Sequence, residues 1–204
     1  MSEEYALKYT ESGGLTIAYQ IWGSSDKTLI YVPGMISHLE AALGDPEYLS
    51  WIRGLSEFFK VIIFDKRGQG LSDRDASAPN LEERMDDISS IVKAEKLENF
   101  FLLGLSEGAS ISLIYAATYP QNVKSVAVFG GTARFTKDDD YPWNPEPDKI
   151  KETLLSNWGT GSSGYIFCPQ KMPAKQADFA KLERMVCNPK TLKSVLELLT
   201  RVDI

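Results

Sequence analysis

The sequence predicts an α/β fold with a mostly parallel sheet and helices on both of its faces. Apolar runs that do not alternate with polar residues predict strands buried on both sides. Four such runs occur: Leu29 to Val32, Val61 to Phe64, Phe100 to Leu103, and Val126 to Phe129. Each run ends at a turn signal, and helical patterns lie between the runs. Strands that alternate with helices form a parallel sheet with helices packed on it.

The first segment of the chain departs from that alternation. Tyr5 to Thr10 and Leu15 to Trp22 are joined across Gly13 and Gly14, which predicts an N-terminal antiparallel hairpin. Asn80, followed three residues later by an acid, is typical of a helix N-cap. The segment from Ala109 to Tyr119 is apolar nearly all round, as expected of a helix packed centrally on a sheet.

The chain divides by composition into two parts. We expect residues 1–135 to form the α/β core and residues 136–204 to form a connector and a helical lid. The connector is polar and rich in proline. Three helical stretches follow it: Ile150 to Trp158, Ala177 to Val186, and Pro189 to Arg201.

Bulk properties limit the classes of partner. The chain has 204 residues, 43% of them hydrophobic, and a net charge of −6, which argues against nucleic acid or an anionic membrane surface as its partner. No apolar stretch has the length of a spanning helix, and the acidic N-terminus differs from a signal peptide, so we expect a cytoplasmic protein. Cys168 and Cys187 lack the spacing of metal ligands. We expect no metal and no cofactor.

Ser106 is the candidate catalytic residue. It is the centre of Gly104-Leu105-Ser106-Glu107-Gly108, which follows an apolar run and opens a helical stretch. This is the strand, sharp turn and helix in which a G-x-S-x-G elbow presents a serine nucleophile. Gly104 and Gly108 support the elbow because its tight turn leaves no room for side chains there.

A serine nucleophile also needs backbone N–H groups that stabilise an oxyanion. We expect one from Glu107, the residue after the nucleophile at a helix N-terminus. We expect the other from Met35, in the turn after the first of the four runs, where Gly34 allows close backbone approach.

The glycine-rich segment Asp65 to Asp73 follows the next run. It lacks the third glycine of a dinucleotide-binding loop, so we interpret it as a structural turn. We expect an ion pair between Asp65 and Arg67 to fix that turn.

Several segments together resemble the α/β-hydrolases, and more narrowly the branch found beside or fused to class III adenylyl/guanylyl cyclases. They are residues 32–40 (VPGMISHLE), 64–74 (FDKRGQGLSDR), 81–87 (LEERMDD), 104–108 (GLSEG) and 116–120 (AATYP). The resemblance implies an eight-stranded sheet, a lid over the elbow and Ser106 as nucleophile. It also implies two strands after the lid that carry the triad acid and histidine, and this chain ends where they would begin.

The single histidine, His38, precedes Ser106, whereas the elbow fold orders its triad as Ser, acid, His. As a surrogate base His38 would have to lie within about 3 Å of the Ser106 hydroxyl. Loop packing is the alternative role. Candidate acids are few, and Asp138 to Asp140 are better explained as part of a solvated connector.

The sequence therefore predicts a serine hydrolase of ester or acyl bonds that is weakly active or inactive as this chain alone. The alternative is a non-catalytic module that binds a small apolar ligand or acts as a sensor. The expected partner is a small acyl substrate or apolar ligand. An uncovered sheet edge would also allow self-association or pairing with a complementing chain.

Overall fold

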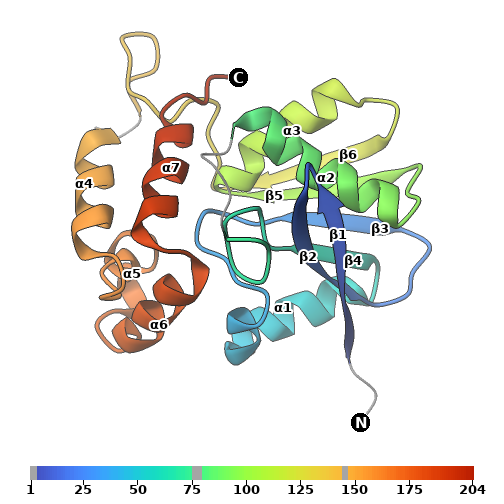
Figure 1. Ribbon diagram of the computed structural model, residues 1–204, viewed down its shortest axis with the longest axis horizontal. Coiled ribbons are helices and arrows are strands. Elements are labelled where there is room, and N and C mark those ends of the chain that lie inside the picture. Colours follow the sequence, from blue (N-terminus) through green and yellow to red (C-terminus); the bar gives the residue numbers. More distant parts are fainter. Residues whose placement is uncertain (1–3, 75–79, 144–146) are drawn as a thin grey trace.

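The computed structural model describes residues 4–74, 80–143 and 147–204 (Figure 1). Within these residues six strands form one sheet in the order β1-β2-β4-β3-β5-β6. The strands are β1 (Tyr5–Ser12), β2 (Leu15–Trp22), β3 (Thr28–Val32), β4 (Lys60–Phe64), β5 (Phe100–Leu105) and β6 (Val123–Phe129). Pairing is antiparallel between β1 and β2 and between β2 and β4, and parallel among β4, β3, β5 and β6. The predicted mostly parallel sheet with an N-terminal hairpin is confirmed.

Helices cover both faces of the sheet, as the sequence predicts (Figure 1). Alternate residues of β3 show this most clearly. Ile30 and Val32 belong to a buried cluster with residues of α2 (Leu81–Ala94) and α3 (Glu107–Thr118). Tyr31 belongs to a second cluster with Ile52 of α1 (Pro46–Ser56), because successive side chains of a strand point to opposite faces.

Helix α1 was not predicted from the sequence. Asp45 caps it by accepting a hydrogen bond from the Glu47 amide at 2.9 Å, and Pro46 occupies the first helical position. The cap predicted at Asn80 is present, since Asn80 and Glu83 exchange reciprocal side-chain-to-backbone hydrogen bonds.

The later helices gather in a separate group at the side of the sheet (Figure 1). They are α4 (Pro147–Asn157), α5 (Ser163–Phe167), α6 (Gln176–Val186) and α7 (Pro189–Leu199), and short 3-10 turns occur at η1 (Ala41–Gly44) and η2 (Pro169–Lys171). Side chains of α4, α6 and α7 form a third buried cluster with Met35. Because Met35 follows the end of β3, these helices lie at the carboxyl ends of the parallel strands. Within residues 4–74, 80–143 and 147–204, no helix is long and apolar enough to cross a membrane.

Candidate active site

Ser106 lies in the sharp turn between β5 and α3, at the carboxyl edge of the sheet. Its φ is 54° and its ψ is −120°, a strained conformation for a residue other than glycine. Its amide donates to the Phe129 carbonyl at 3.0 Å, and its carbonyl accepts from the Ala109 amide at 3.0 Å. The backbone of the turn is thus held by hydrogen bonds. Among the described residues no group is hydrogen-bonded to the Ser106 hydroxyl.

The three supporting glycines predicted from the sequence occupy positions where the turn is packed against its neighbours. A Cβ on Gly104 would stand 2.5 Å from the Gly108 carbonyl oxygen, and one on Gly108 would stand 2.1 Å from the Val32 carbonyl oxygen. A Cβ on Gly34 would lie 3.1 Å from the Cβ of Ser106. The loop after β3 therefore runs directly against the candidate nucleophile.

The sequence predicts the amides of Met35 and Glu107 as oxyanion donors. No described residue accepts a hydrogen bond from the amide of Met35 or from that of Glu107. Glu107 is the first residue of α3, where the helix dipole favours negative charge. Met35 follows Gly34, on which an added Cβ would lie 3.1 Å from the Ser106 Cβ. The structure places both predicted donors beside the turn that holds the serine.

Charged side chains are buried beneath this turn, and their role was not predicted from the sequence. The Lys66 ammonium donates to the carbonyl oxygens of Pro33 at 2.9 Å and Gly34 at 2.6 Å. The carboxylate of Glu107 lies 3.5 Å from Lys66 Nζ and 3.5 Å from Arg84 Nε. Burial lowers the pKa of Lys66, and the adjacent Glu107 carboxylate opposes that shift.

The spacing of charged residues in α2 indicates that some of them are buried. Arg84 and Asp87 share the spacing of Ile88 and Ile91, the apolar residues of α2 that face the core. Charged residues on the core-facing stripe of a helix indicate buried ion pairs, since unpaired charges are rarely buried.

The predicted ion pair between Asp65 and Arg67 is wrong. Arg67 instead pairs with Asp87 at 2.7 Å, on helix α2. The Asp65 carboxylate accepts hydrogen bonds from the amides of Leu39 and Leu71, at 3.1 and 2.8 Å. Burial raises the pKa of Asp65 to about 7, against the opposing effect of these amides. The turn is fixed by backbone hydrogen bonds to Asp65 and not by an Asp65–Arg67 pair.

The His38 side chain forms hydrogen bonds within its own loop. Its Nδ1 accepts from the amides of Glu40 and Ala41, at 3.2 and 3.4 Å. Burial, and next the positive charge of Arg74, lower the pKa of His38. With Nδ1 accepting, the neutral ring carries its proton on Nε2 and has no free basic nitrogen for Ser106. The loop-packing role of His38 is the one that the contacts support.

Asp138 and Asp140, the other candidates weighed from sequence, lie on the surface. Both contact the Arg134 guanidinium, at 3.5 and 2.8 Å, while they stay largely exposed. Nothing in these contacts links them to Ser106.

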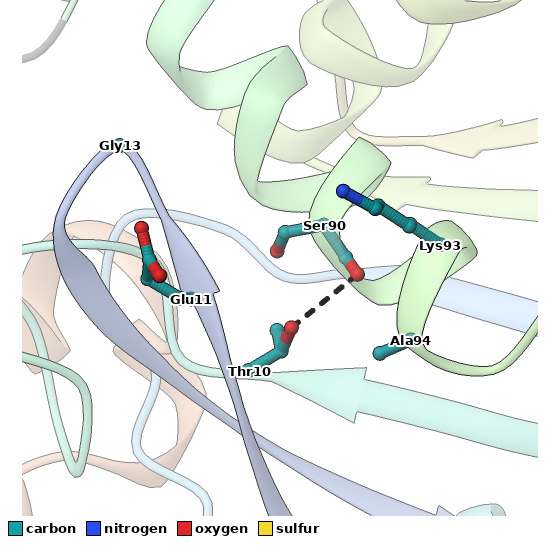
Figure 2. A pocket seen from close by; sticks show the side chains of 6 residues that line it. All are labelled: Thr10, Glu11, Gly13, Ser90, Lys93 and Ala94. Atoms are coloured by element: carbon teal, nitrogen blue, oxygen red, sulfur yellow. Dashed lines mark hydrogen bonds between the residues drawn. The ribbon is translucent and has the colours of Figure 1, made fainter.

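An open hollow lies elsewhere, between β1 and α2 (Figure 2). It is lined by Thr10, Glu11, Gly13, Ser90, Lys93 and Ala94. A hydrogen bond of 3.4 Å from the Thr10 hydroxyl to the Ser90 carbonyl joins β1 to α2 across it. Since β1 is at the opposite edge of the sheet from β5 and β6, this hollow is separate from Ser106.

A mostly parallel sheet with a strained serine between a central strand and its helix is the architecture of the α/β-hydrolases. Residues 27–165 match the family described as alpha/beta hydrolase fold, and the chain belongs to this family.

Relatives by sequence include enzymes with hydrolase names. The chain is 32% identical over 130 residues to serine hydrolase BPHL of Homo sapiens, a match covering 62% of this chain and 43% of BPHL. It is 28% identical over 131 residues to a 2-(acetamidomethylene)succinate hydrolase of Mesorhizobium japonicum, which covers 64% of this chain and 45% of that protein. The chain thus aligns with less than half the length of these relatives.

Solved structures agree in fold. The chain is similar to the esterase EaEST of Exiguobacterium antarcticum, with a TM-score of 0.80 and 24% identity over 96% of this chain and 74% of that one. It is also similar to an enol-lactonase of Burkholderia xenovorans LB400, with a TM-score of 0.75 and 18% identity over 96% of this chain and 74% of that one. At these identities the likeness shows the fold alone.

Proposed function

We propose that this chain carries the nucleophile and the anion-binding groups of a serine hydrolase that acts on esters or related acyl bonds. The observation that carries the proposal is the conformation of Ser106, with φ at 54° and a hydroxyl that no described residue binds. A strained conformation at a serine between strand and helix is the signature of an exposed nucleophile. The hydrolase and esterase names of the relatives agree with this class.

The proposed reaction proceeds through an acyl-enzyme. Ser106 Oγ attacks the carbonyl carbon of the substrate while its proton passes to a base. The carbonyl oxygen becomes an oxyanion that accepts hydrogen bonds from the Met35 and Glu107 amides. Collapse releases the alcohol, which takes up the proton, and water then hydrolyses the acyl-enzyme to the free acid.

The base in this scheme is not His38, whose Nδ1 is occupied by two amides. We propose that a complementing chain supplies it. The outer edge of β6 is a suitable docking place, because within the described residues β6 ends the sheet and pairs with β5 on one side only. Phe129, 73% exposed, lies at the end of this strand.

Three further parts of the proposal rest on sequence. We propose that residues 136–204 act as the lid of the site, that the chain works in the cytoplasm, and that it belongs to the cyclase-associated branch. The last rests on the five sequence segments that together resemble that branch.

Hydrolysis of p-nitrophenyl acetate by the chain, by Ser106→Ala and by Ser125→Ala tests the proposal. Ser125 is exposed on β6 and provides a matched control. We expect slow turnover above the uncatalysed rate, lost in Ser106→Ala and retained in Ser125→Ala. Equal rates for the chain and Ser106→Ala would overturn the proposal.

A further inference from the structure

The buried ammonium of Lys66 contacts both segments that carry the candidate anion-binding amides. On one side it donates to the carbonyl oxygens of Pro33 and Gly34, at 2.9 and 2.6 Å. On the other side it lies 3.5 Å from the carboxylate of Glu107. The side chain is 1% exposed, so water does not compete for these contacts.

The bond to Gly34 fixes the direction of the Met35 amide. The peptide between Gly34 and Met35 is planar and trans, so its N–H points away from the side to which its carbonyl points. Since that carbonyl points to Lys66, the Met35 N–H points away from Lys66.

Two more contacts hold Met35 in place. The buried Gln69 side chain donates to the Met35 carbonyl at 2.9 Å, so three consecutive carbonyls, those of residues 33–35, are bound by Lys66 and Gln69. The Met35 side chain is buried among Leu154, Val186 and Leu192 of the later helices. The loop is therefore held by hydrogen bonds from Lys66 and Gln69 and by the packing of Met35 against the later helices.

We propose that Lys66 is a positioning residue that fixes the two anion-binding amides relative to each other, by linking the Glu107 side chain to the Gly34 carbonyl. The path from one amide to the other runs from Met35 through the Gly34 carbonyl, Lys66 Nζ and the Glu107 carboxylate to the Glu107 backbone. This inference rests on the proposed function of Ser106 and adds to it a residue outside the elbow.

The contacts of Lys66 are explained less well by a role in which its side chain only fills space in the core. Burial of an ammonium is unfavourable even after relaxation, and an apolar side chain of similar volume would fill the space without that cost. Precise placement of oxyanion donors is worth such a cost, since loss of a single donor reduces turnover by about 10²–10³-fold in a serine protease.

The experiment measures the affinity of phenylboronic acid, whose trigonal boron bonds to a serine Oγ while the serine proton passes to the buffer. The resulting tetrahedral adduct places an oxygen where the oxyanion would sit, and its formation needs no histidine. Binding is followed by ¹¹B NMR, and the Met35 amide is followed by ¹H–¹⁵N NMR. The variants are Lys66→Met, Lys66→Arg and Gln69→Met. A control, Arg67→Met with Asp87→Leu, replaces a buried ion pair that does not contact the loop.

We expect Lys66→Met to bind at least tenfold more weakly than the parent chain, with partial recovery in Lys66→Arg. The Met35 amide should shift on adduct formation in the parent chain and in the control, but not in Lys66→Met. The control should bind within threefold of the parent, whatever its thermal stability. If Lys66→Met fails to fold, Gln69→Met, which releases the Met35 carbonyl, should still weaken binding several-fold.

Two failures are distinguishable. Equal affinity and an equal Met35 shift in the parent and in Lys66→Met would overturn the role of Lys66 while the function of Ser106 stands. An adduct that forms equally in Ser106→Ala, or none in the parent chain, would overturn the proposed function and the inference that rests on it.

Discussion

The backbone of Gly108 lies so close to Val32 that a Cβ on Gly108 would stand 2.1 Å from the Val32 carbonyl oxygen. The contact joins the first turn of α3 to the end of β3, and so holds the elbow against the loop that carries Met35. Since the neighbouring atom belongs to the backbone, it cannot move aside without disturbing the sheet.

We therefore expect Gly108→Ala to destabilise the protein by more than about 2 kcal/mol. Gly54→Ala is a control for which we expect the opposite change in stability. Gly54 lies within α1, and nothing stands within 4 Å of a Cβ added there. Gly54→Ala should stabilise the protein by about 0.5–1 kcal/mol, since alanine favours the helix. Urea unfolding measures both changes, and a Gly108→Ala variant as stable as the parent would contradict this close packing.

Asp65 predicts a pH dependence of stability. Its pKa is raised by burial to about 7, so between about pH 4 and 7 the folded protein holds a proton that the unfolded chain releases. The free energy of unfolding should then fall as the pH rises through this range, by at most about 1.4 kcal/mol per pH unit. Asp65→Asn removes this contribution, so the parent should lose stability relative to the variant between about pH 4 and 7.

The difference in the free energy of unfolding between the parent and Asp65→Asn, followed over pH, gives the contribution of Asp65 alone. His38 has a pKa lowered by burial and acts in the opposite sense, since stability from His38 grows as the pH rises toward its unfolded pKa. Both proteins contain His38, so its contribution cancels. The exposed Glu57→Gln variant serves as the control. Urea titrations at several pH values give the comparison, and parallel profiles for the parent and Asp65→Asn would show that Asp65 ionises normally.

The two thiols should differ in reactivity. Burial raises the pKa of Cys187 to about 12, and its side chain is 2% exposed, whereas Cys168 is partly exposed. The thiolate is the reactive form, so Ellman's reagent should modify one thiol per native chain quickly. Cys168→Ser should remove that fast phase and Cys187→Ser should retain it. Fast modification of two thiols in the native protein is the contrary result.

The outer edge of β6 predicts self-association. Edge strands with apolar residues pair readily with other chains, and Val128 is 48% exposed on β6. Sedimentation velocity should detect dimers or larger species at micromolar concentration, and Val128→Lys should reduce them. Tyr9→Lys, on the exposed face of β1 at the other edge, is the control and should leave association unchanged. A parent chain that stays monomeric throughout would contradict this prediction.

Much of the fold could be predicted because its signals are local. The apolar runs at Leu29 and Phe100, with the glycines that follow them, suffice for buried strands and their turns. Gly104 and Gly108 mark the elbow because only glycine fits their surroundings. Helix α1 escaped prediction, since its one fully buried residue, Ile52, leaves a weak apolar pattern.

The pairing of the buried charged side chains could not be predicted from local sequence patterns. Lys66 and Glu107 are 41 positions apart, and their contact depends on how β4, α3 and the loop after β3 meet in space. The wrong pairing of Asp65 with Arg67 has the same cause: the partner of Arg67 is Asp87, on a helix that packs from another direction. Local spacing identifies candidates for ion pairs, but tertiary packing selects the pairs.

The rate of labelling by a fluorophosphonate, with the modified peptide mapped by mass spectrometry, tests the central claim most directly. The reagent phosphonylates serines that are presented as nucleophiles, and without a base at Ser106 the reaction should be slow. We predict slow labelling confined to Ser106 and abolished in Ser106→Ala. Labelling at another residue, or labelling that persists unchanged in Ser106→Ala, would contradict the account.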